Sequence, residues 1–86
     1  MNKPNHKEIN IALIARSAKK HGLGMSVADG GDPLGPACVY IRWEHDPMLP
    51  PDIGIKCTNE LIGTEGMHEP LIEDLEDMAR MRGWIE

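Results

Sequence analysis

The chain has 86 residues, with 9 lysines and arginines against 14 aspartates and glutamates, and a formal net charge of −5. This length predicts a single small domain over residues 1–86. No apolar run approaches the roughly 18 residues that a membrane span requires, and residues 1–8 lack the apolar core of a secretory signal. We therefore expect a cytoplasmic protein without membrane contact. Two cysteines are too few for a disulfide scaffold.

The charge is distributed unevenly along the chain. Residues 1–21 hold five bases and one acid, a balance of +4, whereas residues 22–86 hold four bases and 13 acids, a balance of −9. Such asymmetry often accompanies binding to a charged partner, and it also favours solubility.

A first helix is predicted over residues 6–21. Asn5 is a suitable N-cap, and Glu8 stands three residues later, as in a capping box. Gly22 can adopt the left-handed conformation that ends a helix, with Leu23 folding back onto Ala18.

Three strands are expected next, because apolar side chains recur at every second position. The predicted strands are residues 23–28, 37–44 and 53–58. The segments between them, residues 29–36 and 45–51, are rich in glycine and proline and are expected to be loops. These loops are too short for crossover helices, so neighbouring strands must run antiparallel.

Residues 59–68 are expected to form a loose segment, followed by a second helix with Pro70 in its first turn and Gly83 at its end. The predicted fold class is α+β. We expect two layers, with a three-stranded antiparallel sheet and two helices on one face, in the order α-β-β-β-α.

This order of elements is similar to that of the double-stranded RNA-binding domain. That family contacts phosphates with lysines at the start of its second helix. The corresponding positions here carry Glu69, Glu73 and Asp74. The sign of the charge is reversed, so no functional residue of that family carries over.

The acids of the second helix are the leading candidate site. They are Glu69, Glu73, Asp74, Glu76 and Asp77. The last four of them span about 6 Å of helix axis, a linear charge density comparable to that of duplex DNA. This face can therefore occupy a nucleic-acid-binding site on a larger protein, as small phage-type inhibitors do. The alternative is a solvated helix in which these acids complement the dipole and Glu76 pairs with Arg80.

The first helix offers two further surfaces. Ile9 and Leu13 lie opposite the expected core side. Either they pack beneath the segment that carries Leu61 and Ile62, or they form an apolar patch that a homodimer or a different partner protein would bury. The bases of this helix are an alternative nucleic-acid-binding site. They are Lys7, Arg16, Lys19 and Lys20.

Chemistry at this chain's own residues is not expected. No histidine, cysteine or carboxylate group has a recognised metal-ligand spacing, and no glycine-rich phosphate loop precedes a helix. We therefore expect no cofactor, no metal and no enzymatic activity. The leading hypothesis is a non-enzymatic protein-binding module whose partner is a larger protein with a basic surface, with direct nucleic-acid binding or a structural homodimer as alternatives.

Overall fold

The structure is a computed structural model that describes residues 5–29, 38–46 and 53–86. Along the chain, its helices and strands are α1 (His6–Lys20), β1 (Gly24–Asp29), β2 (Cys38–Glu44), β3 (Ile53–Thr58), α2 (Asn59–Ile62) and α3 (His68–Met81). The predicted α+β class and the order of the main elements are confirmed. The first expected loop, residues 29–36, is wrong at Asp29, which ends β1. The rest of that loop, residues 47–51 of the second expected loop, and residue 37 of the second predicted strand lie outside the described residues.

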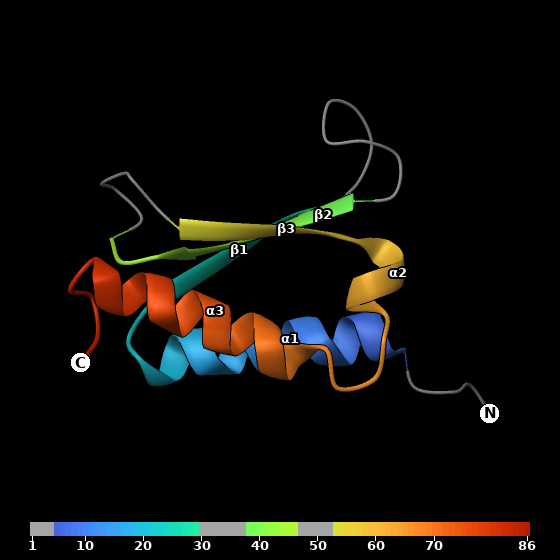
Figure 1. Cartoon of the computed structure of the whole chain (residues 1–86), viewed down its shortest axis with the longest axis horizontal. Helices are drawn as coiled ribbons and strands as arrows, with labels where there is room; N and C mark the ends of the chain where they lie inside the picture. The colour runs from blue at the N-terminus through green and yellow to red at the C-terminus, as the bar shows by residue number, and fades with distance from the viewer. Residues whose placement is uncertain (1–4, 30–37, 47–52) are drawn as a thin grey trace.

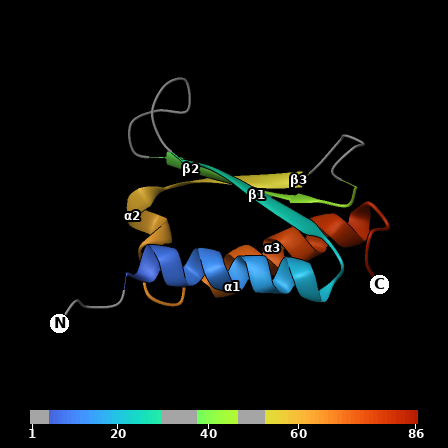
Figure 2. The ribbon, with the colours of Figure 1, turned by 180° about the vertical axis from the view of Figure 1, so that it is seen from behind.

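The three strands form one antiparallel sheet in the order β1-β2-β3. Val27 lies opposite Ile41, and Ile41 lies opposite Ile55, so one face of the sheet is apolar across its width. Both long helices cover this face, with α3 nearer the viewer in Figure 1 and α1 nearer in Figure 2. None of the described helices is long and apolar enough to cross a membrane.

The core lies between the sheet and the two helices. Trp43 and Ile41 of the central strand are fully buried, as are Ile14 of α1 and Leu75 of α3. Val27 lies on the same face of the sheet but is 37% exposed. It belongs to β1, an edge strand of the sheet, where the helix layer covers less of the surface.

Both ends of α1 follow the sequence signals. The Asn5 side chain accepts hydrogen bonds from the backbone N–H groups of Lys7 and Glu8. Gly22 has φ of 75°, and the Leu23 N–H reaches back to the Ala18 carbonyl at 2.8 Å. Glycine suits this conformation because it has no Cβ.

The expectation of a loose segment at residues 59–68 is wrong in part. It contains the short helix α2, where the Thr58 hydroxyl accepts a hydrogen bond from the Leu61 N–H at 3.0 Å. One turn is too short for helical periodicity to show, although a threonine cap is a recognised start signal. The long helix also starts two residues before Pro70, at His68. Proline is tolerated there because N–H groups of the first turn have no partner within the helix.

Candidate protein-binding surfaces

The predicted acidic surface lies on α3, and its members do not all face the same way. Glu69, Glu73, Asp74 and Asp77 are exposed, whereas Glu76 is half-buried. Glu69, Glu73 and Asp77 recur every four residues, so they form one stripe on the solvent side of the helix. Because α3 rises about 1.5 Å per residue, this stripe is about 12 Å long.

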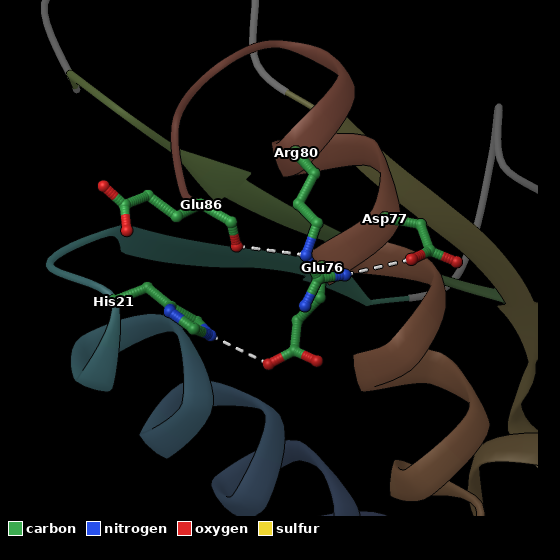
Figure 3. Close-up of polar contacts among 5 residues, drawn as sticks. All are labelled: His21, Glu76, Asp77, Arg80 and Glu86. Atoms are coloured by element: carbon green, nitrogen blue, oxygen red, sulfur yellow. Dashed lines mark hydrogen bonds and ion pairs between the residues drawn. The ribbon is translucent and has the colours of Figure 1, made fainter.

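Glu76 is turned away from this stripe and towards α1. His21 donates a hydrogen bond from Nε2 to Glu76 Oε2 at 2.8 Å, as Figure 3 shows. The expected pairing of Glu76 with Arg80 is therefore wrong. Glu76 lies on the side of α3 that packs against α1, and the carboxylate holds the end of α1 in place.

Arg80 instead binds Asp77 and the end of the described chain. Its Nη1 lies 3.1 Å from Asp77 Oδ1, and its Nε donates to the Glu86 carbonyl at 3.2 Å (Figure 3). The Asp77 carboxylate is thus compensated, although its side chain remains 65% exposed. Glu69, Glu73 and Asp74 form no ion pair with any described residue, so the open negative charge lies in the first half of α3.

The basic residues of α1 also differ in whether they form an ion pair. Lys7 binds Asp29 at the end of β1, with Nζ 2.9 Å from Oδ2. Arg16, Lys19 and Lys20 are exposed. The alternative nucleic-acid surface therefore retains three exposed bases, and two of them lie in the last turn of α1, where the helix dipole favours positive charge.

The two apolar candidates on α1 differ in exposure. Ile9 is 40% exposed and Leu13 is half-buried. On α2, Ile62 is fully buried while Leu61 is 42% exposed. A small exposed apolar surface thus remains on α1, centred on Ile9.

A buried polar cluster that the sequence did not indicate connects α1 to the turn before α3. The Asn10 side chain is 1% exposed; its Nδ2 donates to the carbonyls of Ile62 at 2.7 Å and Thr64 at 2.8 Å. Its Oδ1 accepts from His68 Nδ1 at 3.1 Å. Asn10 stands four and eight residues before the buried Ile14 and Ala18, and this spacing was the available signal.

A cleft opens beside the start of β3. Its volume is about 270 Å³, and it is lined by Ile53, Gly54, Met78, Met81 and Arg82. The Met81 side chain is 88% exposed. No expected site included these residues, because Met78 reads as part of the core stripe of α3.

The remaining reactive groups do not gather into a site. Burial raises the pKa of the Cys57 thiol above its ordinary value, and a second contribution comes from the Cys38 thiol nearby. Within residues 5–29, 38–46 and 53–86, no three side chains from histidine, cysteine, aspartate and glutamate converge as metal ligands.

Comparison of the chain with protein-family models, curated proteins and solved structures found no match.

Proposed function

We propose that this protein is a non-enzymatic binding module whose acidic α3 face occupies a basic, nucleic-acid-binding site on a larger protein. The proposed interaction is cytoplasmic and of the kind made by phage or mobile-element inhibitors. The observation that supports it is the set of exposed carboxylates at Glu69, Glu73 and Asp74, which have no ion-pair partner among the described residues.

The charge spacing suits such a site. With Asp77, four exposed acids occupy about 12 Å of helix axis, or one charge per about 4 Å. One strand of duplex DNA carries a charge about every 3.4 Å. The α3 face therefore resembles one strand rather than the whole duplex, because Glu76 is engaged with His21.

The experiment compares two variants with the same change in charge. Immobilised wild-type protein captures proteins from a host lysate, and duplex DNA is used to elute those held through a nucleic-acid-binding site. We expect Glu69→Gln with Glu73→Gln to abolish this DNA-eluted fraction. The control, Glu60→Gln with Glu65→Gln, changes exposed acids outside α3 and should retain it. Equal capture by both variants, or no DNA-eluted protein from the wild type, contradicts the proposal.

The alternative is direct nucleic-acid binding by Arg16, Lys19 and Lys20, which are all exposed on α1. Binding through phosphate contacts weakens steeply with salt. A gel shift at low salt that retains a labelled duplex, and loses it when the three bases are replaced by glutamine, would favour this function. The acidic α3 face opposes it, because it repels phosphate.

A structural homodimer through Ile9 and Leu13 is the third candidate. The 40% exposure of Ile9 supports it. Light scattering distinguishes it, since a dimeric mass that becomes monomeric with Ile9→Ser is the expected result and a monomeric wild type eliminates it.

A further inference from the structure

The cleft beside β3 has a predominantly apolar wall. Met78 is half-buried against the core, and Met81, three residues later, is almost fully exposed. Together with Ile53, these side chains border a volume of about 270 Å³. Methionine adapts its shape readily and recurs on surfaces that receive apolar partners.

The floor of this cleft continues into a strand edge. β3 pairs with β2 on one side, and no strand within the described residues pairs with its other side. Every second residue of an edge strand directs its N–H and C=O groups outwards. The six residues of β3 thus offer an edge of about 20 Å to an extended chain.

Helix α3 lies above this edge strand. Three strands spaced about 4.8 Å apart place the outer strand axes about 10 Å from each other, and the axes of two packed helices are separated by a similar 8–10 Å. Each long helix therefore lies above its own edge strand, α1 over β1 and α3 over β3. Asp74, Met78 and Met81 recur at i, i+4 and i+7, so the same side of α3 forms the roof over the β3 edge.

The two ends of this groove carry opposite charges, which would orient a bound chain. Arg82 lines the cleft next to Ile53, where β3 starts. Asp74 lies two turns earlier in α3, towards the end of β3. An extended chain beneath α3 therefore meets a carboxylate at one end and a guanidinium at the other.

We propose that this groove binds an extended segment of a partner protein as a fourth strand, antiparallel to β3. The segment carries a base at its first end, near Asp74, apolar side chains facing Met78 and Met81, and a carboxylate at its last end, near Arg82. This interface does not depend on the proposed function of the acidic α3 face. The two share Asp74, whereas Glu69, Glu73 and Asp77 belong to the solvent-side stripe alone.

A second copy of the chain fits this groove less well. Pairing β3 with β3 of another copy would bring two α3 helices, each lying over its own β3, within about one strand spacing of each other. Packed helices need 8–10 Å between their axes. A single extended strand has no helix of its own, so it can pair with β3 without this clash between helices.

The probe is a fluorescein-labelled heptapeptide, Lys-Thr-Val-Thr-Val-Thr-Glu, whose charged and valine side chains all lie on one face of an extended strand. We expect saturable binding to the full chain, followed by fluorescence anisotropy, with a Kd below about 1 mM. The same residues in reverse order should bind at least about threefold more weakly, because both end charges then face like charges. N-methylation of alternate amides should abolish binding, since it removes the strand hydrogen bonds.

Matched variants locate the site. Met81→Ser should weaken binding about tenfold through lost apolar contact, without a change in folding, because the side chain is exposed. Leu61→Ser removes another exposed apolar side chain, on α2, and should leave binding unchanged. Glu69→Gln with Glu73→Gln should also leave it unchanged, which separates this result from the test of the α3 stripe.

Three outcomes overturn the proposal. They are the absence of saturable peptide binding, equal binding by the Met81→Ser variant, and equal binding of the N-methylated peptide. A dimeric wild type that becomes monomeric with Met81→Ser would instead assign the groove to a second copy of the chain. Light scattering of the same samples measures whether the protein is dimeric or monomeric.

Discussion

His21 and Glu76 join the two long helices across 55 residues of sequence, with Nε2 of the imidazole 2.8 Å from Oε2 of the carboxylate. Both side chains are about three-quarters buried, at 22% and 25% exposure. The imidazole also lies beside the buried indole of Trp43, with ring centroids 6.2 Å apart. The pair therefore closes the end of α1 over the core and also removes one acid from the α3 surface.

This contact predicts a measurable coupling. Substituting Glu76→Gln and His21→Asn singly and together should give an interaction free energy of about 0.5–1.5 kcal/mol in urea denaturation, since one charged hydrogen bond at a partly exposed site is lost. Glu73→Gln, which changes an exposed acid one turn earlier, should leave the free energy of unfolding nearly unchanged. A coupling indistinguishable from zero would show that the contact does not stabilise the fold.

Among the described polar residues, Asn10 is the one whose substitution should cost the most stability, because it is fully buried. Asn10→Leu leaves the carbonyls of Ile62 and Thr64 without their side-chain donor inside the protein. We expect the free energy of unfolding to fall by about 2–4 kcal/mol, since buried polar groups would lose their partners. Arg16→Leu, at an exposed position on the same helix, is the control and should change it by less than about 0.5 kcal/mol. A change below about 0.5 kcal/mol for Asn10→Leu would contradict the stabilising role of the Asn10 hydrogen bonds.

The Cys57 thiol predicts a dependence of stability on alkaline pH. Burial raises its pKa in the folded state above the ordinary value of 9.0, whereas the unfolded chain releases this proton at the ordinary value. The contribution to stability is complete below pH 9.0 and declines as the pH rises towards the folded-state pKa. Wild type should therefore lose stability relative to Cys57→Val above pH 9.0, measured by urea denaturation at several pH values.

The same burial should protect Cys57 from alkylation. Iodoacetamide should modify the half-buried Cys38 first and Cys57 only when the chain unfolds, because the thiolate is the reactive form. Mass spectrometry of peptides after a time course distinguishes the two sites. Simultaneous modification of both would show that the burial does not control the reactivity.

Gly54 and Tyr40 should be strongly coupled. A Cβ added at Gly54 would lie 2.4 Å from Cζ and Oη of the Tyr40 ring, so the ring covers the glycine on the outer face of the sheet. We expect Gly54→Ala to cost about 1–3 kcal/mol, because the ring must move. In the background of Tyr40→Ala, the same change should be neutral or stabilising, because alanine orders the strand better than glycine. Additive effects in thermal denaturation would contradict this contact.

The sequence predicts those parts of the fold that depend only on neighbouring residues, such as helix ends and the alternation of a strand. Asn5 and Gly22 mark the ends of α1 through their own side-chain or backbone chemistry, and the alternation of Val39, Ile41 and Trp43 identifies the central strand and its buried face. Each of these signals is contained within a few neighbouring residues.

The candidate surfaces were predicted less completely, because they depend on contacts between distant residues. Nothing near Glu76 in the sequence shows that His21 binds it, and the acid was therefore counted with the exposed ones. Asn10 reads as an ordinary polar helix residue until the turn after α2 brings two carbonyls to it. The groove at β3 depends on how α3 packs above the edge strand, and no sequence period encodes this packing.

The helix layer is assembled from the first and the last helix of the described chain, and this has a consequence during synthesis. When α1 and the sheet have emerged from the ribosome, Leu75 and Ala79 have not, so the apolar face around Trp43 has no cover from α3. Glu76 and His68, which bind α1, arrive in the same late segment. The protein therefore should fold in one step once α3 is released, and a nascent chain stalled before His68 should remain sensitive to protease.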